Sequence, residues 1–238
     1  KEILLSGKKD NDEFVIQCPK DIKKLFDLSR LDDNFKCISG ISTGNDKLFL
    51  SNEKKEPFII PFYKNPGKDK FFTEKIMYLN KEFLTLERII PNFIVRNKEY
   101  LYKSGVICSS MGVQFTACVL PINSTFGVNS CILCDEEDKY WILAYLNSNL
   151  VTYMVRGVLI RSNMITSGYV SRIPLISFND ETKDMLSELG KIAYEGVRWN
   201  KDIKHILDEI DSLVNKEARL SDETIIYINQ FRRDLIRK

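Results

Sequence analysis

The chain has 238 residues, a formal charge of +2 at pH 7 and 44% hydrophobic residues. This length suits one large domain, or one domain with a helical appendage, and the composition allows a sizeable core. No run of 18 apolar residues occurs, and residues 1–14 hold no signal-peptide core. The sequence therefore argues against a membrane span or a secretory leader and predicts a cytoplasmic protein.

The charge is unevenly distributed along the chain. Residues 54–103 hold 11 Lys and Arg against 6 Asp and Glu, whereas residues 179–238 hold 11 against 13. A basic segment beside an acidic tail is typical of a surface that faces phosphate. A lysine-rich composition in which the lysines only solvate one face explains the numbers equally well, so charge alone leaves both interpretations open.

Residues 35–50 predict two strands joined by a glycine-rich turn. Gly40 and Gly44 permit positive φ at a tight bend. A structural hairpin tip and a ligand-facing loop both fit this pattern, since loops often carry function. The polar candidates for contact at the tip are Thr43, Asn45 and Lys47.

The next part of the chain alternates apolar segments with basic loops. Residues 58–63 and 76–79 predict strands, 83–90 a short helix and 93–96 another strand. The loop 64–70 contains Asn-Pro-Gly, a turn signal. Basic and aromatic residues interleave after the last strand, which suits phosphate and base contact but also an exposed hairpin. The candidates here are Lys64, Lys68, Lys70, Arg96 and Lys98.

Residues 104–134 are apolar and β-prone, and they contain no Lys, Arg, Asp or Glu. Glycine and proline divide the stretch, which predicts two or three strands in the middle of a sheet. A tight corner within it would offer hydrogen bonds from Ser109, Ser110 and Gln114.

The six cysteines lie mostly within apolar runs, as reduced core thiols do. Cys131 and Cys134 form a C-x-x-C pair, the spacing of some zinc and redox sites. Zinc needs four ligands, and the sequence offers no second such pair and one distant histidine, His205. The pair therefore predicts buried strand residues, and no metal site is assigned.

Residues 140–155 are apolar on more than one face and predict a buried helix packed on the sheet. The polar segment 156–174 contains arginine and no acid. Arginine suits bidentate contact with guanine, and asparagine with adenine. Alternatively, these arginines pair with the acidic run 135–138. The candidates in this segment are Arg156, Arg161, Ser162 and Asn163.

The periodic apolar positions of residues 179–215, and a last helix capped by Ser221, predict a helical C-terminus. Together these elements predict an α/β (α+β) fold, with a twisted mixed or antiparallel sheet, packed helices and a C-terminal helical segment. We divide the chain into an N-terminal segment (1–36), an α/β domain (37–178) and a C-terminal helical region (179–238).

No residue is assigned a catalytic role. The sequence lacks a zinc-protease motif, a Walker loop and a dinucleotide fingerprint, and it lacks the Asn/Asp-Pro-Pro-Tyr/Phe tetrapeptide of adenine methylation. The residues by themselves predict a domain that binds something anionic.

Four stretches carry a family resemblance. They are Ile-Ser-Gly-Ile-Ser-Thr-Gly-Asn-Asp-Lys-Leu-Phe-Leu at 38–50, Ile-Ile-Pro-Phe-Tyr-Lys at 59–64 leading to Phe-Phe at 71–72, the strands of 106–133, and Tyr-Leu-Asn-Ser-Asn-Leu at 145–150 with Ile-Pro at 173–174. In this order they resemble the C-terminal target-recognition domain of TaqI-like adenine-N6 DNA methyltransferases, including fused restriction–modification enzymes. The resemblance covers residues 36–215.

The resemblance implies a specificity domain that recognises double-stranded DNA. Lys and Arg would neutralise phosphates while polar side chains read base edges. A partner catalytic domain, in the same parent chain or a separate subunit, would flip an adenine and methylate it with S-adenosylmethionine. No cofactor is then expected in this chain. We expect an excised domain, a split subunit or a remnant of a parent that is a site-specific adenine methyltransferase, with or without endonuclease activity.

Other functions stay open at this point. One half of a type I restriction specificity subunit shares the same architecture. A protein-interaction module that docks a partner through residues 179–236, an RNA reader and a nuclease are further alternatives.

Overall fold

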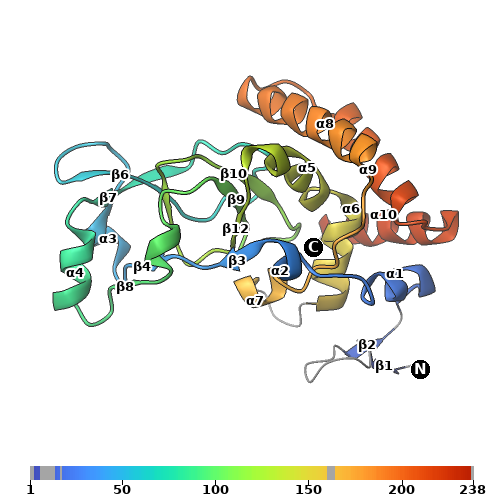
Figure 1. The fold of residues 1–238 in the computed structure, drawn as a ribbon, viewed down its shortest axis with the longest axis horizontal. Helices are drawn as coiled ribbons and strands as arrows, with labels where there is room; N and C mark the ends of the chain where they lie inside the picture. Colours follow the sequence, from blue (N-terminus) through green and yellow to red (C-terminus); the bar gives the residue numbers. More distant parts are fainter. Residues whose placement is uncertain (1–2, 6–13, 17, 160–163, 237–238) are drawn as a thin grey trace.

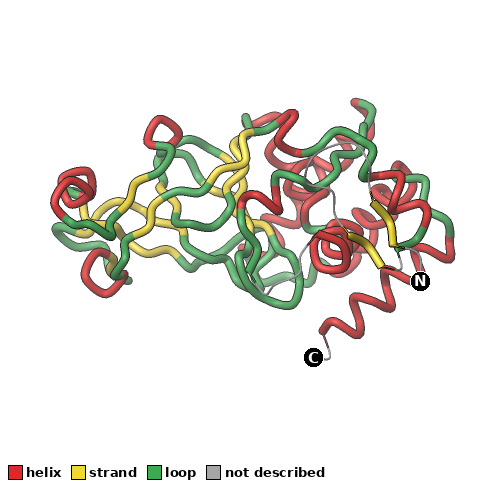
Figure 2. The backbone as a smooth tube through the Cα atoms, turned by 90° about the horizontal axis from the view of Figure 1, so that it is seen from below, coloured by secondary structure: helices red, strands yellow, loops and turns green. Residues whose placement is uncertain are grey.

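The computed structural model describes residues 3–5, 14–16, 18–159 and 164–236. The molecule is elongated, with the strands gathered toward one end and most of the helices toward the other, as Figure 1 and Figure 2 show. Helices and strands are both present, and the sheets contain antiparallel and parallel pairs. The predicted α/β class and helical C-terminus are confirmed. No described helix has both the length and the apolar character that crossing a membrane requires.

A four-stranded antiparallel sheet forms the middle of the molecule. Its order is β10-β9-β12-β3, with β3 at Lys36–Ile38, β9 at Gly105–Cys108, β10 at Ala117–Leu120 and β12 at Cys131–Leu133. All residues of β9 and β10 are buried, as their continuous apolar sequence requires. The stretch 104–134 therefore lies centrally, as predicted, and the corner at 109–114 joins β9 to β10.

A second sheet extends the strand-rich end. Its order is β11-β6-β7-β5, with β5 at Leu50–Ser51, β6 at Phe58–Tyr63, β7 at Ile76–Asn80 and β11 at Thr125–Phe126. Nearby lie β4 (Ile41–Ser42), which pairs with β8 (Ile94–Val95), α4 (Phe83–Ile89) and η1 (Lys98–Tyr100). The predicted strands at 58–63 and 76–79 and the helix at 83–90 are confirmed. The stretch 104–134 supplies a fourth strand, β11, to this second sheet.

The predicted hairpin over residues 35–50 is wrong. β4 pairs with β8 and β5 pairs with β7, and the short helix α3 (Asp46–Phe49) lies between β4 and β5. The turn at Gly44 holds, because its φ is +67° and a Cβ there would lie 2.7 Å from the carbonyl oxygen of Asn92. Each of these two strands therefore pairs with a strand that is distant in sequence, and they do not pair with each other.

Most of the helices gather around the first sheet and away from the second. They are α1 (Lys20–Leu25), α2 (Leu31–Asn34), α5 (Glu136–Leu146), α6 (Asn149–Tyr153), the π-helix η2 (Met154–Leu159), α7 (Ser167–Val170), α8 (Asp180–Arg198), α9 (Lys204–Glu217) and α10 (Asp222–Ile236). A short antiparallel pair, β1 (Ile3–Leu5) and β2 (Phe14–Ile16), lies near the N-terminus. In Figure 1, α8, α9 and α10 form an arc along the helical end.

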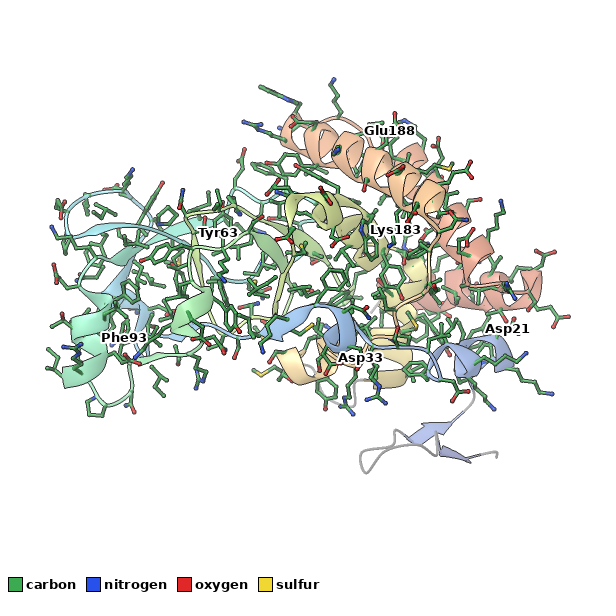
Figure 3. The ribbon with its side chains drawn as sticks, in the orientation of Figure 1. Asp21, Asp33, Tyr63, Phe93, Lys183 and Glu188 are labelled. Atoms are coloured by element: carbon green, nitrogen blue, oxygen red, sulfur yellow. The ribbon has the colours of Figure 1, made fainter. Side chains whose placement is uncertain are left out.

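Two hydrophobic clusters form the core, one in the helical end with the central sheet and one in the strand-rich end. The larger unites the buried helix α5 with α1, the inner faces of α8, α9 and α10, and one face of the central sheet. The smaller fills the strand-rich end, where Phe49 and Phe93 meet edge to face with ring centroids 5.0 Å apart. Figure 3 labels Phe93 and Tyr63 in that end, and Lys183 and Glu188 on α8 at the other.

The break between α5 and α6 explains the polar residues in the predicted helix 140–155. Asn147 Oδ1 accepts a hydrogen bond from Ala117 N at 3.1 Å, and its Nδ2 donates to Ala117 O at 2.9 Å. The side chain therefore pairs with β10 as another strand would. Ser148 caps α6 by accepting from Val151 N at 3.3 Å.

Candidate nucleic-acid interface

Hydrogen bonds join four of the predicted contact segments into one unit. We call residues 43–47, 64–68, 109–114 and Arg156 the four-segment cluster. Three links hold it together, each between residues that are distant in sequence. The four segments belong to separate loops of both sheets and to η2, so only the tertiary fold brings them together.

The first link joins α3 to the loop after β6. Lys64 Nζ forms an ion pair with Asp46 Oδ2, and Thr43 Oγ1 donates to Asp46 Oδ1 at 2.5 Å. Burial acts to raise the pKa of Asp46, but the hydrogen bonds from Lys64 and Thr43 outweigh it, so the pKa lies below its usual value. Asp46 therefore stays ionised and holds the Lys64 ammonium in place.

The second link joins that loop to the corner between β9 and β10. Asn65 Oδ1 accepts from Gly67 N at 3.0 Å and from Ser110 N at 3.4 Å. Thr116 Oγ1 donates to the carbonyl of Gly67 at 2.8 Å. The Asn-Pro-Gly sequence builds this turn, because the Asn side chain bonds the backbone two residues on and Gly67 adopts a φ of +67°.

The third link joins the corner to the helical end. Arg156 Nη2 donates to the carbonyl of Gly112, and Ile165 N donates to the carbonyl of Ser110 at 2.7 Å. Within the corner, Ser109 and Thr116 bond each other twice, so the turn closes on the strand pair. A polar loop with many anchors is pre-organised, and ordering it on binding costs less entropy.

The four-segment cluster is electropositive. It holds Lys47, Lys64, Lys68 and Arg156 against one carboxylate, Asp46. Lys47, Lys64, Lys68 and the neighbouring Asn45 are exposed, and Ser110, Gln114 and Arg156 are half-buried. Such a set can contact phosphate through its cations and offer hydrogen bonds to base edges through its amide and hydroxyl groups.

Three predicted contact residues have their polar groups bonded within the fold instead, and their assignment is corrected. Thr43 and Ser109 are buried, and their hydroxyls are used by Asp46 and by Thr116 N respectively. Lys70 Nζ donates to the carbonyl of Asn147 at 3.0 Å, and burial lowers the pKa of Lys70 to about 8. The polar loop signal did not reveal which of its side chains turn inward.

Two further candidates lie outside the network of links. Arg96 is exposed, and Lys98 forms a 2.5 Å ion pair with Glu87. Within residues 18–159 and 164–236, no hydrogen bond or ion pair joins either residue to the four-segment cluster. Tyr100, an aromatic residue of the same segment, makes cation–π contacts within the chain. Lys36 and Lys103 both lie over its ring, at 5.6 and 5.1 Å from the centroid. Arg161, Ser162 and Asn163 lie outside the described residues.

Asn65 and Asp46 make two of the links; both lie within predicted contact segments but were not among the candidate residues. Asn65 carried a signal, because asparagine before Pro-Gly favours a side-chain-closed turn. Asp46 carried none, since its partner is 18 residues away.

The C-x-x-C pair lies where the sequence placed it, in and beside a buried strand. Cys131 is fully buried in β12, and burial raises the pKa of its thiol well above the usual value. Across the described ranges, no three His, Cys, Asp or Glu side chains are grouped so as to hold a metal ion.

Comparison of the chain with known protein families and with curated proteins finds no match.

Proposed function

We propose that this chain is the sequence-specific DNA-recognition domain of an adenine-N6 DNA methyltransferase of the restriction–modification type. The observation that supports this most is the four-segment cluster. Three loop segments and Arg156 of η2, all far apart in sequence, converge, and they bring four cations together with a single carboxylate. A chance distribution of lysines on a solvated surface gives no reason for the cross-links between these loops.

In this proposal the roles follow from exposure and chemistry. Lys47, Lys64 and Lys68 contact phosphates, which provides affinity and salt dependence but no sequence information. Asn45 and Gln114 present amide groups that can pair with base edges in the major groove. The anchored corner 109–114 keeps its groups in fixed positions, which base reading requires.

The chemistry belongs to a partner catalytic domain. That domain holds S-adenosylmethionine, which supplies the methyl group, while this chain grips the duplex and sets the register. No reaction step is assigned to residues of this chain.

The proposal is tested by duplex binding against salt. Fluorescence anisotropy with a labelled duplex of randomised sequence, at about 50 to 200 mM salt, gives a log–log slope of about −0.9 for each phosphate neutralised. Lys47→Gln, Lys64→Gln and Lys68→Gln each reduce the slope by about one. The control is Lys183→Gln, because Lys183 lies over the ring of Trp141 at the helical end.

Two outcomes would count against the proposal. One is the absence of duplex binding at about 50 mM salt. The other is a slope that changes as much in the Lys183 control as in the cluster variants. Selection of bound sequences from the randomised pool then shows whether recognition is specific, and an RNA duplex of the same sequence separates DNA from RNA readers.

One observation favours a protein-interaction role as the second candidate. Met185 and Ile192 on α8, and Trp199 directly after its end, follow one another at intervals of seven residues, and they are 44%, 46% and 65% exposed. A stripe with this spacing suits a partner helix. If Met185→Gln with Ile192→Gln abolishes a protein complex while duplex binding is absent from the wild type, this second function replaces the first.

A further inference from the structure

We propose that the cleft between α9 and α10 is a binding site for a divalent oxyanion, a phosphate or dicarboxylate group. This inference is independent of the DNA-binding proposal. It rests on a cavity, on two enclosed polar atoms that have no hydrogen-bond partner in the described part of the chain, and on an excess of positive charge in an otherwise acidic region.

The cavity has the size of a small-molecule site. Its volume is about 890 Å³, and it opens between the two helices above the N-terminus of α6. Ligand pockets of about 300–1,000 Å³ hold molecules of metabolite size. The wall is mixed: Leu220, Ile225 and Ile226 contribute apolar surface, and the remaining lining residues are polar or charged.

Two polar atoms in the lining are buried without a hydrogen-bond partner among the described residues. They are Arg232 Nε, a donor, and Asn215 Oδ1, an acceptor. An enclosed polar atom without a partner costs about 1–3 kcal/mol, so such atoms in a folded protein indicate a missing ligand or solvent. An oxyanion offers the acceptor that Arg232 Nε lacks, and a hydrogen phosphate also carries a hydroxyl that can donate to an acceptor such as Asn215 Oδ1.

The charge of the cleft is opposite to that of its surroundings. The region 179–238 has more acidic than basic residues. The lining of the cleft nevertheless holds four cations, Lys204, Lys216, Arg232 and Arg233, against Asp208 and Asp211. Two positive charges are therefore left over, which is the charge that a divalent anion balances.

The base of the cleft is already ordered. Asp211 accepts from Asn149 N at 2.7 Å and from Asn149 Nδ2 at 2.5 Å, and Asn149 Nδ2 also lies 3.4 Å from Asn229 Oδ1. Lys70 is close enough to this base for its pKa to respond to both charges: burial lowers that pKa, Arg232 lowers it further and Asp211 raises it. The site is built from three helices whose side chains fix one another, which lowers the cost of binding.

Isothermal titration calorimetry of the whole chain tests the proposal. Inorganic phosphate and succinate are the two probes, and each is titrated at constant ionic strength with chloride as the balancing anion. We expect one site, with affinity reduced at least about ten-fold by Arg232→Gln and by Asn215→Asp, which places a carboxylate against the anion. Lys201→Gln and Lys64→Gln are the controls, since Lys201 lies outside the cleft and Lys64 belongs to the four-segment cluster.

Each result of the titrations either assigns a ligand class to the cleft or rejects the proposal. Tighter phosphate binding assigns the site to a phosphate-bearing ligand, and tighter succinate binding assigns it to a carboxylate. No binding, equal binding by Arg232→Gln and wild type, or loss of binding in Lys64→Gln alone would overturn the proposal. If a cleft variant fails to fold, the backbone amide signals of Asn215 and Asn229 in the wild type decide, because phosphate must shift them more than those of 43–47.

Discussion

Lys70 Nζ donates a hydrogen bond to the main-chain carbonyl of Asn147 at 3.0 Å, at the break between α5 and α6. The Asn147 side chain pairs in turn with the backbone of Ala117 on the edge strand β10. One lysine and one asparagine therefore join the loop after β6, the buried helix and the central sheet. The Lys70 ammonium therefore anchors the loop 64–70 to the helix break, and it is not offered to a ligand.

The stability of the Lys70→Met variant is expected to depend on pH differently from that of the wild type. The folded pKa of Lys70 is about 8 against 10.5 for an exposed lysine, so its stabilising contribution is present above 10.5 and is lost as the pH falls through 8. Relative to the wild type, the Met variant should gain up to about 3 kcal/mol between pH 10.5 and pH 7. Urea unfolding at both pH values measures the change, and an unchanged difference between the two proteins would contradict it.

The contribution of Asp211 to stability changes with pH in the opposite direction. Burial raises its pKa to about 6 from 3.8, so its contribution to stability is complete below 3.8 and is lost as the pH rises through 6. Asp211→Asn should therefore become more stable relative to the wild type by up to about 3 kcal/mol on going from pH 4 to pH 7. Asp208→Asn, an exposed neighbour, is the control and should show little change.

The ion pair between Asp46 and Lys64 predicts opposite effects of two substitutions on duplex affinity. Asp46→Asn removes the carboxylate that competes with phosphate for Lys64 and should tighten binding by roughly two- to five-fold, the value of an exposed pair. Lys64→Gln should weaken binding and lower the salt slope by about one. Anisotropy titrations measure both, and weaker binding by the Asp46 variant, with an unchanged melting temperature, would mean that the pair orders the loop for binding.

Asn147→Leu is expected to be severely destabilising. It leaves Ala117 N and O on β10 without their partners at a buried position. Each unsatisfied group costs about 1–3 kcal/mol, which suggests a total of about 3–5 kcal/mol. Chemical denaturation checks this, and Asn80→Leu, at a half-buried strand end, provides a comparison. A loss below about 1 kcal/mol would show that water replaces the side chain.

Gly190→Ala tests the packing of α8 on α5. Helix propensity alone would favour alanine by about 1 kcal/mol. A Cβ at this position would lie 2.4 Å from the carbonyl oxygen of Tyr140, however, so α8 must move away from α5. We expect a net destabilisation of about 2–4 kcal/mol, because overpacking against backbone outweighs propensity. Gly168→Ala is the matched control, since the nearest atom to its added Cβ is 3.8 Å away.

The sequence by itself determined the elements whose signal is local. The apolar run 58–63 and the 3.6-residue periodicity of 179–215 each carry their own burial pattern, so β6, α8 and α9 follow without knowledge of their partners. The Asn-Pro-Gly turn at 65–67 is local in the same way. These features depend on neighbours a few residues apart, which a single sequence displays.

Only the tertiary structure decided how those pieces meet. Residues 35–50 had the pattern of a hairpin, but β4 pairs with β8 and β5 with β7, and in these pairings Ile41 and Leu50 are buried in the core. The tertiary structure also directs the Ser109 hydroxyl and the Lys70 ammonium to partners within the fold, and it places Lys64 beside Asp46. A residue type shows what a side chain can bond, whereas the surrounding chain decides whether water or protein supplies the partner.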